Sequence, residues 1–212
     1  MEELFAEAFH YRELGDECFR AQDYPGAISN YDRAIQLVPD YVLAYENRGL
    51  AFFKLRQFDN ALEDYNACLR LFGDRASIYW KRALVHYKCR RYDQAIADYA
   101  VSFALEPPEP WLYYIRGETY FYKGDYQKAI VDYSRTLEVD GDNPYLYQRR
   151  GRAYAAVDDY DRALSDLDKA IQLNATSVIA YRARAKVYRA KGMTSLAEAD
   201  EETARLIDQQ PG

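Results

Sequence analysis

The sequence predicts an all-α solenoid of six helix–turn–helix units, and three observations support this. A tyrosine recurs every 34 residues without insertion or deletion, at Tyr11, Tyr45, Tyr79, Tyr113, Tyr147 and Tyr181. An alanine series has the same spacing, at Ala27, Ala61, Ala95, Ala129, Ala163 and Ala197. Apolar residues within a unit, as in the stretch 27–35, follow helical spacing. A fixed period of this length is typical of repeat proteins in which each unit packs only on its neighbours.

The first three units are expected at residues 8–41, 42–75 and 76–109, with residues 1–7 extending the first helix. Turn-forming residues mark the ends of these units at Pro39, Gly73 and Pro107, and Asp23 marks the turn inside the first unit. Each unit therefore reads as helix, tight turn, helix and short linker.

The last three units are expected at residues 110–143, 144–177 and 178–211. Gly124 and Asp158 mark turns inside the fourth and fifth units, and Gly141 marks the link between them. In the sixth unit, polar residues replace apolar ones at several repeat positions, which predicts a polar capping face. These residues are Thr194, Glu198, Glu201 and Arg205.

A series of small residues is expected where the two helices of each unit approach closely. It consists of Gly15, Gly49, Ala83, Gly117, Gly151 and Ala185. Tyrosines fill the space beside them in the first four units, at Tyr31, Tyr65, Tyr99 and Tyr133. Most of the high tyrosine content is thus explained by packing.

The first unit carries the motif of a known family. Its pattern of aromatic, Leu-Gly, alanine, aromatic, alanine and proline is formed by Tyr11, Leu14, Gly15, Ala27, Tyr31, Ala34 and Pro39, with Cys18 where a tyrosine is usual. With six copies in phase, the chain resembles a tetratricopeptide repeat (TPR) protein over nearly its whole length. The resemblance implies a right-handed α-solenoid whose first helices line a concave groove that binds protein partners.

Paired charges form a second repeated pattern. Five units carry an arginine, and an aspartate follows each one by 16 residues, giving Arg48–Asp64, Arg82–Asp98, Arg116–Asp132, Arg150–Asp166 and Arg184–Asp200. The first unit has Leu14 and Asn30 instead, so the aspartate occurs only where the arginine does. We therefore expect ion pairs within units, since a partly buried arginine needs a carboxylate. The alternative is that the stacked arginines bind a polyanion.

The groove-facing positions that remain are the candidate partner-binding residues. Aromatic rings dominate the middle of the set: Phe53, Trp80, Tyr87, Trp111, Tyr114, Phe121, Tyr122 and Tyr145. Basic residues dominate its C-terminal end: Arg152, Arg182, Lys186 and Arg189. Aromatic residues are enriched at interface hot spots, so we expect a peptide or helical segment of a partner protein to bind here. Packing of some rings between adjacent helices is the alternative for each.

Two other interaction functions stay open. TPR co-chaperones hold acidic chaperone tails in a clamp of basic and asparagine residues, and that pattern falls here on Arg12, Asn47 and Lys81. The clamp is incomplete, because Asp16 and Ser77 stand at its other two positions. Alternatively, the chain self-associates as a structural scaffold, since its N-terminal residues Leu4, Phe5 and Phe9 are apolar.

Composition and motifs disfavour other functional classes. The net charge of −6 disfavours nucleic-acid binding, and no apolar stretch is long enough to cross a bilayer. The three cysteines and two histidines match no metal or disulfide spacing, and no catalytic motif is present. We expect a protein without catalytic, cofactor-binding or metal-binding residues. The N-terminus lacks the features of a signal peptide, so we expect a cytoplasmic location.

Overall fold

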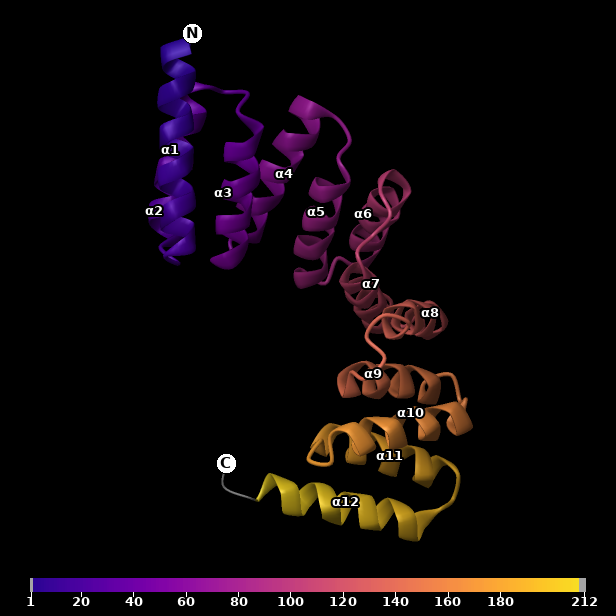
Figure 1. Cartoon of the computed structure of the whole chain (residues 1–212). Helices are drawn as coiled ribbons and strands as arrows, with labels where there is room; N and C mark the ends of the chain where they lie inside the picture. Colours follow the sequence, from indigo (N-terminus) through magenta and orange to yellow (C-terminus); the bar gives the residue numbers. More distant parts are fainter. Residues whose placement is uncertain (1, 210–212) are drawn as a thin grey trace. The chain divides into compact units, whose positions relative to one another are not determined.

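The computed structural model describes residues 2–209, and within this range the chain forms twelve helices and no strand (Figure 1). This confirms the predicted all-α fold. The chain divides into two compact units, one up to residue 107 and one from residue 108 onward. From here on, a unit is one of these two parts, and each 34-residue helix pair is called a repeat. We describe each unit by itself.

Each unit contains three antiparallel helix pairs in which consecutive helices pack on each other. The first unit consists of α1 (Glu2–Arg20), α2 (Tyr24–Leu37), α3 (Val42–Lys54), α4 (Phe58–Phe72), α5 (Ala76–Lys88) and α6 (Tyr92–Leu105). The second consists of α7 (Pro110–Lys123), α8 (Tyr126–Leu137), α9 (Pro144–Ala155), α10 (Tyr160–Leu173), α11 (Val178–Ala190) and α12 (Thr194–Asp208).

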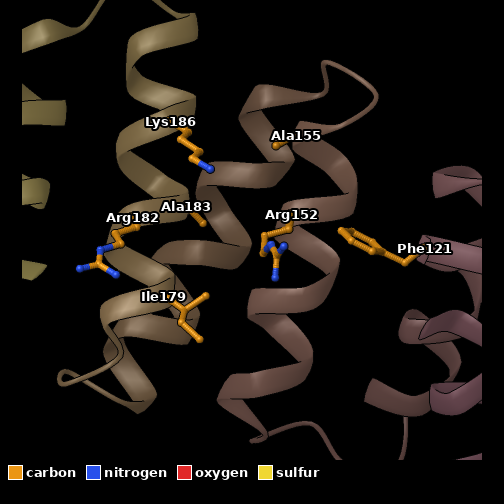
Figure 2. Close-up of a pocket in the computed structure, with 7 residues that line it drawn as sticks. All are labelled: Phe121, Arg152, Ala155, Ile179, Arg182, Ala183 and Lys186. Carbon is orange, nitrogen blue, oxygen red and sulfur yellow. The ribbon is translucent and has the colours of Figure 1, made fainter. Parts of the chain in front are cut away.

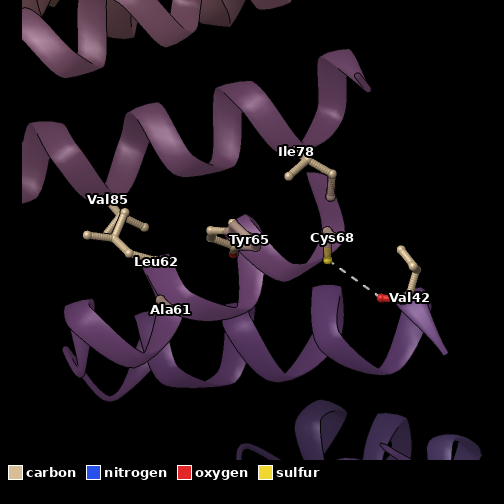
Figure 3. Close-up of a cluster of buried hydrophobic side chains, with 7 residues drawn as sticks. All are labelled: Val42, Ala61, Leu62, Tyr65, Cys68, Ile78 and Val85. Atoms are coloured by element: carbon tan, nitrogen blue, oxygen red, sulfur yellow. Dashed lines mark hydrogen bonds between the residues drawn. The ribbon is translucent and has the colours of Figure 1, made fainter. Parts of the chain in front are cut away.

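The repeated alanines and tyrosines form the core, as the sequence predicts. All six alanines of the series that begins at Ala27 are fully buried, and so are the four tyrosines that begin at Tyr31. In the first unit, Tyr65 lies among aliphatic side chains of α4 and α5, and the Cys68 thiol donates to the Val42 carbonyl at 3.7 Å (Figure 3). A Cβ on Gly15 would stand 2.5 Å from the Tyr31 ring, so the small residue is required for this close approach.

The turn inside every repeat contains one residue in the left-handed region. These residues lie 34 positions apart, at Gln22, Arg56, Arg90, Gly124, Asp158 and Gly192, with φ between 58° and 93°. The amide after each bonds back to a carbonyl five residues earlier, as from Asp23 to Cys18 at 2.9 Å. This is the Schellman arrangement that ends many helices. Glycine occupies only two of the six positions, so four turns hold a side chain in a conformation that costs free energy.

The five predicted arginine–aspartate pairs all form, each within its own repeat. In every pair Nε and Nη2 donate to the two carboxylate oxygens at 2.6–2.9 Å. The aspartates are buried and the arginines are partly buried. Because the charges are matched, the polyanion alternative loses its basis.

A third guanidinium nitrogen links four of these arginines to the preceding repeat, which the sequence did not lead us to expect. Nη1 of Arg82 donates to Asn66 at 2.7 Å, and Nη1 of Arg150 donates to Ser134 at 3.0 Å. Arg48 and Arg184 reach Asp32 and Asp168 in the same way. The pairs therefore join the two helices of one repeat and also join neighbouring repeats.

Candidate functional site

A pocket of about 360 Å³ lies in the second unit between α7, α9 and α11 (Figure 2). Figure 2 shows the Phe121 ring reaching from α7 toward Arg152 of α9, with residues of α11 on the other side. The lining residues are Phe121, Arg152, Ala155, Ile179, Arg182, Ala183 and Lys186. Four of the predicted site residues are therefore brought together.

The positive charges at this pocket differ in how far the chain itself offsets them. Arg182 forms an ion pair with Asp208 at the end of α12. Arg189, which does not line the pocket, forms a two-bond ion pair with Glu201. Neither Arg152 nor Lys186 has an acidic partner within residues 2–209. Arg152 instead lies over the Phe121 ring, 5.3 Å from its centre. The uncompensated charge is thus concentrated at two of the four predicted cations.

Five predicted aromatic residues lie on α7 and the start of α9. Trp111, Tyr122 and Tyr145 are 44%, 52% and 44% exposed, and Tyr114 and Phe121 are half-buried. The rings of Tyr114 and Tyr145 lie 6.0 Å apart, and their hydroxyl oxygens are 3.4 Å apart. Half-exposed rings fixed by neighbours are typical of interface anchors.

A buried charged cluster lies beneath these rings, and sequence reasoning missed it. Arg149 of α9 donates from Nε to Glu118 Oε1 at 2.6 Å and from Nη2 to Oε2, and both residues are only 4% exposed. The Tyr133 hydroxyl also donates to Glu118. Burial alone lowers the pKa of Arg149, but the Glu118 carboxylate raises this pKa above its ordinary value. The pair's signal in the sequence was two opposite charges 31 residues apart on successive first helices.

The predicted aromatic residues of the first unit are all half-buried. Phe53 packs against Phe58 with ring centres 5.9 Å apart, and Tyr87 packs against Tyr92 at 6.3 Å. The Trp80 ring lies 5.3 Å from the ammonium of Lys81. A pocket of about 430 Å³ includes Phe53 but neither of the other two predicted rings. These residues are spread along the unit.

The three residues of the partial clamp are bound within the chain. Arg12 forms an ion pair with Asp16, and the Asn47 amide donates to the same carboxylate at 2.8 Å. Lys81 forms an ion pair with Glu46. The cations that would hold a partner's carboxylate already have carboxylates of their own.

Three further features of the structure concern His86, metal binding and membrane spanning. His86 is buried, and its Nδ1 has no hydrogen-bond partner there. Between residues 2 and 209, no group of three His, Cys, Asp or Glu side chains is placed to hold a metal ion. In the same range, each helix is too short or too polar to span a bilayer.

Comparison with known families gives matches along much of the chain. Residues 15–56 match the TPR repeat, and residues 42–74, 110–143 and 144–177 match the tetratricopeptide repeat. Together these matches cover more than half of the sequence. No curated protein sequence gives a match.

Several solved structures have a similar fold. The MamA protein is 23% identical, with a TM-score of 0.74, covering 83% of this chain and 94% of that chain. YrrB, described as a TPR protein with an unusual peptide-binding site, is 18% identical, with a TM-score of 0.74 and coverages of 84% and 91%. The APC/C hetero-tetramer Cut9–Hcn1 is 21% identical, with a TM-score of 0.68 and coverages of 97% and 40%. At these identities the likeness establishes the fold alone.

Proposed function

Because the chain belongs to the tetratricopeptide repeat family, whose members mediate protein–protein interactions, we propose that it is a non-catalytic adaptor. Its partner site is the face of the second unit formed by α7, α9 and α11. The ligand is a peptide or helical segment of another protein that carries acidic residues beside apolar anchors. The observation that carries this proposal is the pocket lined by the half-buried Phe121 ring and by Arg152 and Lys186, two cations that have no acidic partner within residues 2–209.

The two parts of this face have different physical roles. Aromatic side chains such as Trp111 and Tyr145 bury a large area at low conformational cost, so they supply affinity. The cations of the pocket attract an acidic segment and set its orientation, which mainly raises the association rate. Raised salt should therefore slow association more than it speeds release. The peptide-binding site described for YrrB supports peptide binding as a mode available to this fold.

The co-chaperone alternative is weaker, because a clamp must present free positive charge. Arg12 and Lys81 are each neutralised by a carboxylate of the chain. Breaking those ion pairs to admit a partner's carboxylate would offset much of the gain.

Self-association is the second candidate, and one surface favours it. Leu4, Phe5 and Phe9 are about half exposed and line an apolar pocket of about 720 Å³ with the end of α2. If this surface joins copies, Phe5→Glu should lower the oligomeric state measured by sedimentation. A wild-type chain that stays monomeric at high concentration would exclude this function.

Peptide selection from a random displayed library tests the main proposal. We expect enriched peptides to be acidic with aromatic or large aliphatic residues. The tightest of them should lose about thirty-fold in affinity with Trp111→Ala, equivalent to about 2 kcal/mol. Arg152→Glu should mainly lower the association rate constant measured by surface plasmon resonance.

Two control variants test whether a loss of binding is specific to the face formed by α7, α9 and α11. Phe72→Ala removes an exposed ring from α4, and Arg162→Gln removes an exposed charge from α10. Neither should change the affinity. Enrichment of basic peptides, failure to enrich any peptide, or binding that survives both Trp111→Ala and Arg152→Glu would contradict the proposal.

A further inference from the structure

The Arg149–Glu118 pair lies outside the repeated framework of ion pairs. The framework arginines bind aspartates 16 residues later in their own repeat, whereas Arg149 binds a glutamate 31 residues earlier, on the preceding first helix. Its neighbour Arg150 makes the framework contact from the same helix, so α9 already has its structural pair. A second, fully buried ion pair gives little net stability, because desolvation of both charges opposes their attraction.

The guanidinium of Arg149 contacts three of the rings on the proposed binding face. Its central carbon lies 4.6 Å from the centre of the Phe121 ring, 5.4 Å from that of Tyr122 and 5.9 Å from that of Tyr145. A cation over an aromatic face is attracted to it, and more strongly where water is excluded. Glu118 holds Nε and Nη2 of Arg149, so the guanidinium is fixed in place. All three rings therefore pack against the same rigid group.

We propose that Arg149 is a positioning residue: held by Glu118, it fixes the rings of Phe121, Tyr122 and Tyr145 in the arrangement that receives the apolar anchor of a partner segment. The inference rests on the proposed function for what binds, but the positioning itself is a property of the unbound protein. A surface whose side chains are already ordered loses less conformational entropy on binding.

The first unit contains an equivalent cluster without the arginine. Asp16 occupies the same repeat position as Glu118, three repeats earlier, and accepts from Tyr31 at 2.7 Å and from Asn47 at 2.8 Å. The sequence separations, 15 and 31 residues, are those by which Tyr133 and Arg149 reach Glu118. There Arg12, on the same helix, matches the charge of Asp16, so the residue on the next first helix can be a neutral amide. In the fourth repeat Tyr114 stands at the position of Arg12, so Arg149 both matches the charge of Glu118 and reaches the rings.

The pair also sets where each part of the ligand lies. Glu118 cancels the charge of Arg149, so the ring surface above it is apolar and nearly neutral. Arg152, one helical turn along α9, keeps its charge and touches the same Phe121 ring. A partner segment should therefore place its apolar anchor at Tyr122 and Tyr145 and its carboxylate toward Arg152.

The test uses the full chain and a double variant that removes both charges of the pair. Glu118→Gln combined with Arg149→Met leaves neither charge stranded, and the amide oxygen at position 118 can still accept from the Tyr133 hydroxyl. The control is Asp166→Asn, which breaks the framework pair of the adjacent Arg150 and leaves the Arg149 contacts in place. Both proteins are compared with wild type well below their unfolding midpoints.

The first readout needs no ligand. With 3-fluorotyrosine in place of Tyr145, the fluorine resonance should move toward its position in the unfolded chain in the double variant. It should stay at its wild-type position in Asp166→Asn. An unmoved resonance in a folded double variant would overturn the positioning role, whatever the binding data show.

The second readout is the affinity for the tightest peptide selected on wild type. The double variant should weaken binding by about tenfold or more, and Asp166→Asn should leave it unchanged. Equal affinities for wild type and the double variant would overturn the inference. If no peptide binds wild type, the proposed function fails, and the fluorine readout still decides whether Arg149 positions the rings.

Discussion

Removing one carboxylate of the framework should destabilise the fold, and Asp166→Asn is the sharpest case. Asp166 is 6% exposed and accepts two hydrogen bonds from Arg150, at 2.7 and 2.8 Å. The amide has nearly the same volume, so the change removes charge without creating a cavity. One bond to Arg150 is kept, while the amide NH₂ faces a guanidinium N–H.

The size of the effect follows from what remains around Arg150. Stranding one member of a buried ion pair costs about 3–5 kcal/mol. Here the arginine side chain is 19% exposed, and Ser134 still accepts from Nη1 at 3.0 Å. Both features reduce the cost of leaving Arg150 without its carboxylate, so we expect the free energy of unfolding to fall by about 2–3 kcal/mol.

Urea unfolding followed by circular dichroism measures this change. The midpoint should fall with an unchanged slope, which shows that stability and not compactness has changed. The companion variant, Arg150→Met with Asp166→Leu, removes both charges and should lose less than the single change, because no charge is stranded. A loss below about 0.5 kcal/mol for Asp166→Asn, or a larger loss for the double variant, would refute this account of the pairs.

Three further predictions concern the packing, the turns and the pH dependence. Gly151→Ala should lower stability by about 1–3 kcal/mol in thermal unfolding, since its Cβ would stand 2.9 Å from Leu167; a neutral effect would show that the helices can separate freely. Arg56→Gly should raise stability by up to about 1 kcal/mol, because φ is 60° there and glycine adopts this left-handed conformation without strain. A lower urea midpoint would show that Arg56 is not strained in this turn. Burial lowers the pKa of His86 from its ordinary 6.5, so the unfolded chain binds this proton more readily and stability falls as the pH drops below that value. His86→Phe should reduce the fall, and an identical pH dependence of the urea midpoint would exclude this cause.

Much of the framework could be predicted from the sequence because each repeat reports on the others. The aspartate is absent only where the arginine is absent, as with Leu14 and Asn30, and that coincidence predicted the pairing within repeats. The bonds of the third nitrogen could not be read in this way. Their acceptors are chemically mixed, since Asp32 and Asp168 are acidic whereas Asn66 and Ser134 are neutral, so no one residue type marks that position in all four repeats.

The turns show a different limit. Glycine marks the left-handed position at Gly124 and Gly192, but Arg56, Arg90 and Asp158 adopt the same conformation. The packing of the two flanking helices imposes the turn, and it outweighs the local preference of the residue. Local propensity therefore predicted where the turns lie and not which residue would take the unusual conformation.

The candidate site was predicted in part. The positions of Phe121, Arg152, Arg182 and Lys186 on successive first helices follow from the period, and they line one pocket. The period does not predict which cations are neutralised, since Arg182 is paired through Asp208 of α12. Arg149 was missed because it lies between the positions assumed to face the groove.

Charge compensation gives a physical reason to place binding at Arg152. The framework arginines and Arg149 lose hydration on folding, but each gains a carboxylate held at hydrogen-bond distance. Arg152 is also half-buried, yet within residues 2–209 it gains an aromatic ring and no acid. Folding therefore leaves the desolvation of this one guanidinium incompletely offset. A partner's carboxylate would complete the compensation, so an acidic ligand gains more at Arg152 than at any arginine whose acid is already in place.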